Sequence, residues 1–253
     1  MHRLDGEPGT AASAEREDAD VETSSEAYAR RFAGPVGAFF QESQAAAVRA
    51  LVAPWPRASI LEVGGGHAQL VGPLVEGAHP VTVYGSGAAC GERLRPWTGS
   101  GRAEFRHGDL LHAPWPDRSF DLVLAFRLLP HVGRWRDLVR ELGRLARHAV
   151  VVDYPTRRSV NALSGALFGW KKGVEGDTRP FTVFRDREVE AAFSDAGLRL
   201  AARRPQFLFP MALHRAAGSA RLARLLEGAA GGLGLTAVLG SPVVARFDRG
   251  SRP

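Results

Sequence analysis

The sequence contains one cysteine, Cys90, among its 253 residues. A single cysteine cannot form a disulfide within the chain, and it cannot build a zinc site from cysteine ligands. Cysteine and histidine form no cluster along the sequence, so no metal site is predicted. No apolar run reaches the roughly 20 residues of a membrane-spanning helix, and the first residues lack the apolar core of a signal peptide. We therefore expect a soluble, cytoplasmic protein without a membrane span.

Lysine is also scarce, since Lys171 and Lys172 are the only two and arginine supplies the remaining basic charge. Residues 1–27 hold eight acidic residues and two arginines, so their net charge is −6 and that of the remaining chain is +12. A chain this basic raises the question of a nucleic-acid partner. The arginines are scattered at solvent-facing helix spacing, however, and no basic strand interleaved with aromatics is present. Solvated helix faces explain the charge better than a nucleic-acid site.

Composition separates an acidic tail from one large domain. Residues 1–22 have almost no large apolar side chains, which predicts disorder. Residues 23–253 are expected to form a single α/β domain, with N-terminal helices over residues 23–54. Regular patterning lapses over residues 155–184, and we expect this segment to cover the ligand edge of the sheet as a substrate lid.

Short apolar runs alternate with helical patterns through most of the chain. This alternation predicts a doubly wound, mostly parallel sheet. The expected strands cover residues 60–63, 80–84, 103–107, 120–125, 148–153, part of 198–209, and 242–248. The main helices are expected over residues 25–32, 39–52, 69–76, 135–147, 160–170, 186–196 and 219–230.

One stretch, residues 59–70, carries the clearest functional signal. A short buried strand ends in Gly64, Gly65 and Gly66 and leads into a possible helix start. Residues without a Cβ let the backbone approach a ligand, and the free N–H groups of a helix start point toward it. A dehydrogenase fingerprint needs a third glycine where Gln69 stands, together with an acid for the ribose. The spacing instead fits an acid, here Glu62, followed by alternating glycines.

With these residues the sequence resembles the class I S-adenosylmethionine-dependent methyltransferases, and the likeness continues in order from about residue 55 to residue 200. The motifs that carry it are Glu62-x-Gly64-x-Gly66-x-Ala68, Phe105 to Leu110, Ala113 to Val123, Leu128 to Val132, and Ala191 to Leu198. The resemblance implies a Rossmann-like seven-stranded sheet whose last strand is antiparallel, with N-terminal helices and a lid insertion. It also implies S-adenosylmethionine as cofactor, S-adenosylhomocysteine as product, and methylation of an O, N or C atom of a small molecule.

The resemblance further implies roles for individual residues. Asp109 is expected to accept from the adenine amino group, the Leu110 backbone to face the ring, and His131 to act as the base. The full expected cofactor set is Glu62, Gly64, Gly65, Gly66, Ser86, Asp109, Leu110, Ala125, Phe126 and Tyr28. The expected substrate contacts are Arg127, Asp153, Tyr154, Trp170 and Phe181.

Two positions depart from the family pattern. Ala68 replaces the usual last glycine, which is a mild change if its φ is negative. Gly85 stands where an acid normally binds both ribose hydroxyls, and Ser86 or a main-chain group is the expected substitute. A carboxylate would bind those hydroxyls more strongly than either.

Simpler structural roles and other functions remain open. In these simpler roles Asp109 serves merely to form a turn, His131 to cap a helix, and Glu62 to hydrogen-bond the nearby backbone. One alternative function is a methyltransferase-like protein with a non-methylating or scaffold role, which the missing ribose acid motivates. A nucleic-acid methyltransferase would explain the basic charge, although no appended binding module is recognisable. A nucleotide-dependent oxidoreductase would need the ribose acid and the third glycine, and this sequence has neither.

Overall fold

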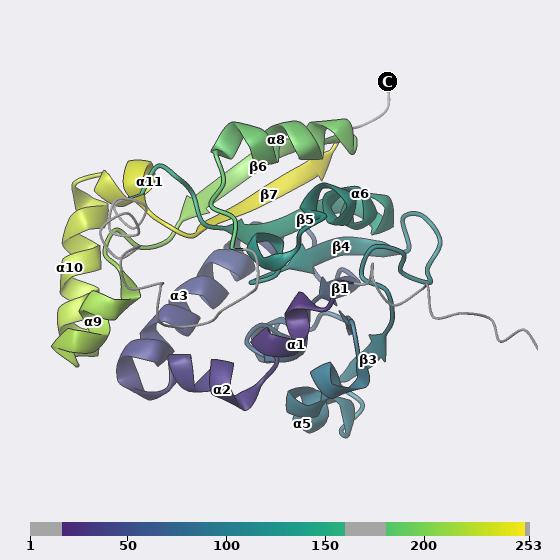
Figure 1. Cartoon of the computed structure of the whole chain (residues 1–253), viewed down its shortest axis with the longest axis horizontal. Helices are drawn as coiled ribbons and strands as arrows, with labels where there is room; N and C mark the ends of the chain where they lie inside the picture. The colour runs from purple at the N-terminus through teal and green to yellow at the C-terminus, as the bar shows by residue number, and fades with distance from the viewer. Residues whose placement is uncertain (1–16, 160–180, 251–253) are drawn as a thin grey trace, which may run out of the picture.

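The computed structural model describes residues 17–159 and 181–250. They form a seven-stranded sheet in the order β3-β2-β1-β4-β5-β7-β6 (Figure 1). Six strands run parallel, and β7 is antiparallel to both of its neighbours, β5 and β6. The predicted fold class is therefore confirmed. The strands are β1 (Ile60–Val63), β2 (Val81–Gly85), β3 (Ala103–His107), β4 (Phe120–Ala125), β5 (Ala146–Tyr154), β6 (Leu198–Pro205) and β7 (Val243–Arg249).

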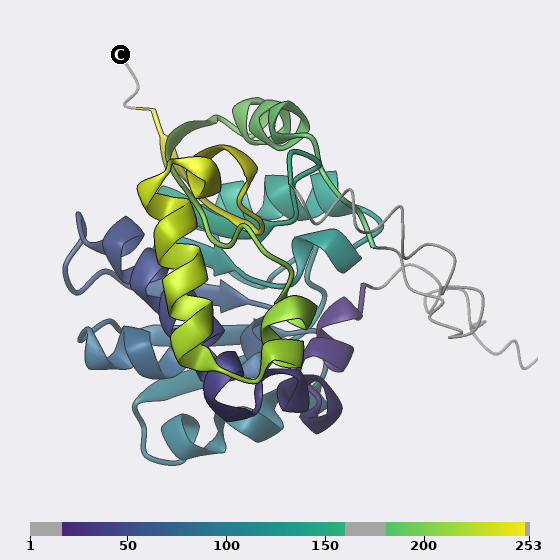
Figure 2. The same ribbon diagram turned by 90° about the vertical axis from the view of Figure 1, so that its left-hand side faces the viewer.

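Helices cover both faces of the sheet and one end of the molecule, where α9, α10 and α11 lie together (Figure 2). The described α-helices are α1 (Ala19–Thr23), α2 (Glu26–Ala29), α3 (Gly34–Val52), α4 (Val71–Glu76), α5 (Arg95–Thr98), α6 (Trp135–Leu145), α8 (Asp186–Asp195), α9 (Met211–Ala217), α10 (Ala220–Gly232) and α11 (Leu235–Leu239). The described residues also form four 3-10 helices: η1 (Arg30–Phe32), η2 (Gly65–His67), η3 (Ala88–Leu94) and η4 (Leu129–His131). None of the described helices is both long and apolar enough to cross a membrane.

The sheet separates two hydrophobic cores, because alternate side chains of a strand point to opposite faces. In β4, Val123 and Ala125 belong to the core beneath α6 and α8. Leu122 and Leu124 belong to the core beneath α3 and α4. Burial on both faces explains why the strand reads as an apolar run from Leu122 to Ala125. The arrangement leaves the carboxyl ends of β1, β2, β4 and β5 at one edge of the sheet.

The N-terminal segment differs from the sequence prediction. Disorder was predicted through residue 22, but α1 begins at Ala19, and both Ala19 and Asp20 are buried. The prediction is wrong for these last residues because polar contacts hold α1: Asp20 accepts from the Ser86 N–H, and Glu17 from the Arg134 N–H. Composition does not reveal such contacts. Residues 1–16, and most of the predicted substrate lid, lie outside the described residues.

Candidate active site

The glycine turn directly follows β1 and bends sharply. Gly64 has a φ of +73°, in the left-handed region that favours glycine, and η2 follows it. Ala68, which ends the turn, also lies in the left-handed region, with a φ of +61°. The condition under which this replacement would be mild, a negative φ, is therefore not met, and the position carries strain of about 1 kcal/mol for a residue with a Cβ. The turn keeps its glycine-like shape although one glycine is missing.

Glu62 is a buried acid beneath this turn. Its side chain is 0% exposed, and neither carboxyl oxygen accepts a hydrogen bond from any described residue. His67 approaches it, with Nε2 3.6 Å from Oε1. Burial raises the pKa of Glu62 to about 8, and burial together with the charge of Arg127 lowers the pKa of His67 to about 3. Both side chains are therefore mainly neutral at pH 7, and Glu62 has no hydrogen-bond partner among the described residues.

The segment expected to hold the adenine contains a tight turn. Asp109 Oδ1 accepts from the Leu111 N–H at 2.9 Å, and Oδ2 lies 2.8 Å from His112 Nδ1. These contacts match the turn-forming role, while the half-exposed carboxylate retains further acceptor positions. Leu110 is 1% exposed and packs in the core beneath α6.

The edge between β1 and β2 is covered by α1, which lies in front of β1 in Figure 1 and contacts both η2 and η3. A Cβ at Gly66 would lie 2.1 Å from Ser24 Oγ, so Ser24 packs directly on the turn. Asp20 Oδ2 accepts from the Ser86 N–H at 2.8 Å. Ser86 thus contributes a backbone donor, and its partner is an acid that the sequence pattern did not single out.

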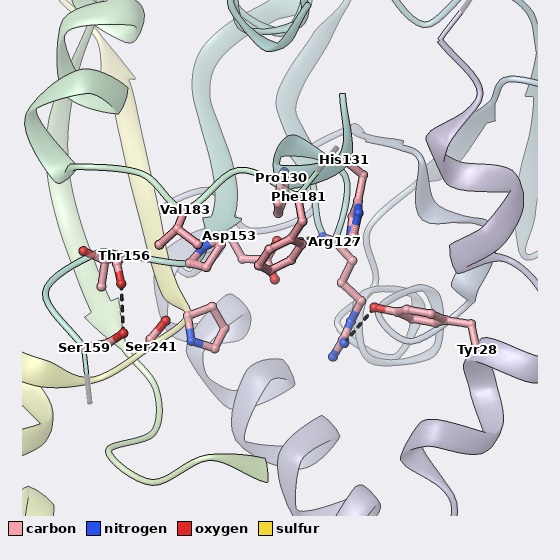
Figure 3. A pocket seen from close by; sticks show the side chains of 12 residues that line it. Tyr28, Arg127, Pro130, His131, Asp153, Thr156, Ser159, Phe181, Val183 and Ser241 are labelled. Carbon is pink, nitrogen blue, oxygen red and sulfur yellow. Dashed lines mark hydrogen bonds between the residues drawn. The ribbon is translucent and has the colours of Figure 1, made fainter. Parts of the chain in front are cut away.

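A cavity of about 320 Å³ opens beside these elements, at the ends of β4 and β5 (Figure 3). The structure brings five of the predicted site residues together in its wall: Tyr28, Arg127, His131, Asp153 and Phe181. The ring of His131 lies 5.4 Å from that of Phe181, measured between centroids. The remaining lining residues are Pro130, Pro155, Thr156, Ser159, Val183, Ser241 and Pro242.

A hydrogen-bonded network holds the floor of the cavity. The Arg127 N–H donates to Asp153 Oδ1 at 2.6 Å, and Gln44 Nε2 donates to Asp153 Oδ2 at 3.1 Å. The Arg127 guanidinium donates to Gln44 Oε1 at 3.2 Å and to the Tyr28 hydroxyl at 3.4 Å, a contact drawn in Figure 3. Burial raises the pKa of the Asp153 carboxyl, and the charge of Arg127 opposes that rise. Gln44 was missed because a polar residue inside an apolar helix face gives no functional signal.

Several predicted residues lie apart from the cavity. Tyr154 is 1% exposed and meets Phe184 edge-on in the core, because it points to the opposite face of β5 from Asp153. Ala125 and Phe126 are fully buried, one in each core. Trp170 lies outside the described residues. Within residues 17–159 and 181–250, no group of three or more His, Cys, Asp or Glu side chains is placed to hold a metal ion.

Comparisons with known proteins agree with this geometry. Residues 61–151 match the family model of a methyltransferase domain. No protein of curated function matches the chain in sequence. Among solved structures, the magnesium protoporphyrin IX methyltransferase of Synechocystis PCC 6803, with bound S-adenosylhomocysteine, is 13% identical and has a TM-score of 0.62. That match covers 88% of this chain and 93% of the Synechocystis chain.

Two further structures share the fold. A Thermotoga maritima protein, described as a possible histamine N-methyltransferase, is 18% identical with a TM-score of 0.60, over 88% of this chain and 95% of that one. The 1,6-didemethyltoxoflavin-N1-methyltransferase of Burkholderia thailandensis is 14% identical with a TM-score of 0.54, over 82% and 77% of the two chains. Residues 61–151 therefore match a methyltransferase domain, and the described chain shares the fold of these solved methyltransferases.

Proposed function

We propose that the protein transfers a methyl group from S-adenosylmethionine to a small-molecule nucleophile bound beside His131. One observation carries the proposal. At the carboxyl ends of neighbouring strands lie a buried acid without a hydrogen bond, beneath a glycine turn, and a cavity that contains a histidine. Ligands of open α/β sheets bind at this edge. The similar structures named above act, by their names, on small molecules, which supports a small acceptor.

The residues around the glycine turn fit an adenosyl cofactor with an amino acid end. An ammonium group would give Glu62 the partner it lacks, and its charge would favour ionisation of the buried carboxyl. Asp109 and the Leu110 backbone are the proposed contacts of the adenine. Ser24, which follows α1, packs on Gly66, and in this proposal α1 moves to admit the cofactor. The cofactor's sulfonium supplies the activated methyl group for a transfer in line between two heteroatoms.

The cavity residues have separate proposed roles in this reaction. His131 accepts the proton of an acceptor hydroxyl or amine as the new bond forms. Arg127 and Asp153, both hydrogen-bonded to Gln44, form a fixed polar floor that orients the acceptor, and preorganised orientation supplies much of the rate. Phe181 and the cavity prolines provide an apolar wall, and Tyr28 closes the side nearest α2. A volume of about 320 Å³ is at the small end of ligand pockets.

Calorimetry with S-adenosylmethionine and S-adenosylhomocysteine tests the cofactor assignment, and both should bind. A panel of phenols and amines, assayed with methyl-tritiated cofactor, then tests methyl transfer. His131→Ala should lower kcat about 100-fold or more while leaving the affinity for S-adenosylhomocysteine unchanged, because a general base acts only in the chemical step. His148→Gln is the matched control, since this histidine is exposed, lies near the start of β5 and does not line the cavity. Absence of binding by both cofactor forms would refute the proposal.

Two observations favour a second candidate, a non-methylating protein of the same fold. The glycine turn is covered by the chain's own Ser24, and the ribose acid is absent from β2. This candidate predicts that neither cofactor form binds, even after residues 1–24 are removed. If the shortened chain binds either cofactor form, the result supports methyl transfer and contradicts this second candidate.

A further inference from the structure

The end of β2 lacks the acid that nucleotide-binding α/β proteins place there for the ribose hydroxyls. The strand ends at Gly85, and neighbouring atoms occupy the space that a side chain at this position would need. A Cβ at Gly85 would lie 2.7 Å from the Cβ of Cys90 and 3.2 Å from the ring of Phe105. An aspartate could not be added at this position without moving both neighbours. A carboxylate at this edge therefore has to come from another element.

Such a carboxylate is present and comes from α1. Asp20 Oδ2 lies 3.3 Å from the position that a Cβ of Gly85 would take, and it accepts from the Ser86 N–H at 2.8 Å. The Asp20 side chain is 0% exposed, and its other oxygen, Oδ1, accepts no hydrogen bond in the described structure. One oxygen is thus anchored at the end of β2, and the other is buried without a hydrogen bond, in a carboxylate whose charge also acts on the Cys90 thiol.

A buried carboxylate oxygen without a partner is costly, because it has lost its water and gained no hydrogen bond. A ribose offers two adjacent hydroxyl donors, which a carboxylate accepts strongly. The other acid of α1, the half-buried Glu22, lies 3.7 Å from the Arg31 guanidinium and therefore already has a charged partner. Asp20 is therefore distinct among the acids of this helix in both position and bonding.

We propose that Asp20 supplies from α1 the carboxylate that accepts the ribose hydroxyls of the adenosyl cofactor, in place of the acid missing from β2. The inference rests on the proposed function. It gives α1 a second role besides covering the site, since the helix opens to admit the cofactor and places Asp20 on the ribose when it closes. Cofactor binding and the docking of α1 then stabilise each other.

Calorimetry on the full chain tests this with two ligands, S-adenosylhomocysteine and its analogue lacking both ribose hydroxyls. Asp20→Ala should weaken the binding of S-adenosylhomocysteine by about 10- to 100-fold, the range for hydrogen bonds to a charged group. Binding of the analogue should change little, so the preference for the intact ribose should disappear. Asp20→Asn keeps one acceptor oxygen and should give an intermediate loss. Glu22→Gln removes the same charge from the same helix and should change neither affinity.

The outcomes separate this inference from the function it rests on. If the unaltered chain binds neither ligand, the proposed function fails and the inference falls with it. If the unaltered chain binds S-adenosylhomocysteine and Asp20→Ala binds it equally well, the inference alone is overturned. Tighter binding by Asp20→Ala also overturns it, because α1 would then be a competitor for the cofactor site. Circular dichroism of each variant checks that the fold is kept.

Discussion

The buried acid beneath the glycine turn should make the stability of the protein depend on pH in a specific way. Folding raises the pKa of Glu62 from 4.5 to about 8, so the folded state holds a proton that the unfolded state releases over this interval. Stability therefore falls as pH rises from 4.5 to about 8. His67 acts in the opposite direction, because its pKa falls from 6.5 to about 3 on folding.

These two effects offset each other between pH 4.5 and 6.5, where the folded chain gains one proton at Glu62 and loses one at His67. Above pH 6.5 only the effect of Glu62 remains. One proton corresponds to about 1.4 kcal/mol per pH unit. The free energy of unfolding should therefore fall by about 2 kcal/mol between pH 6.5 and 8 through this residue. Glu62→Gln has no titrating group and should lose this contribution.

Urea unfolding at pH 6.5 and pH 8.0, without cofactor, measures the difference. The unaltered chain should lose about 2 kcal/mol more than Glu62→Gln over this interval. Glu76→Gln is the control, because its side chain is exposed, and it should behave like the unaltered chain. Equal pH dependence in the unaltered chain and in Glu62→Gln would refute the reasoning, since it would mean that Glu62 is ionised in the folded protein.

Two further predictions follow from close contacts. Gly66→Ala places a methyl group 2.1 Å from Ser24 Oγ and 2.4 Å from the Cys90 carbonyl oxygen, so α1 and η3 should be displaced and the α1 amides should exchange faster with solvent. Gly87→Ala has nothing within 4 Å of its new Cβ and should leave this exchange unchanged. Glu227→Ala leaves two backbone N–H groups before α9, and the ring of His214, without their acceptor. It should cost about 3 kcal/mol in urea unfolding, and a loss under 1 kcal/mol would contradict the assigned contacts.

Much of the fold could be predicted because its signals are local. The apolar run of β4 and the glycines after β1 depend on neighbouring residues, whose spacing sets strand burial and turn shape. The meeting of Arg127, His131 and Asp153 also followed from local reasoning, since the ends of adjacent parallel strands share one edge. Tyr154 could not be separated from Asp153 in this way, because both end the same strand and only packing decides which face meets the cavity.

The sequence by itself determined the alternating elements, the order of the motifs and the nucleotide-type turn, because each of these depends on residues close together in the chain. Tertiary structure alone decided which groups complete the turn. Asp20 lies 66 residues before Ser86 in the chain, within a segment whose composition predicts disorder. Its position depends on how α1 packs against η2 and η3, and no local pattern encodes that contact. The acid missing from β2 was visible in the sequence, whereas the carboxylate that lies in its place became visible only in the folded chain.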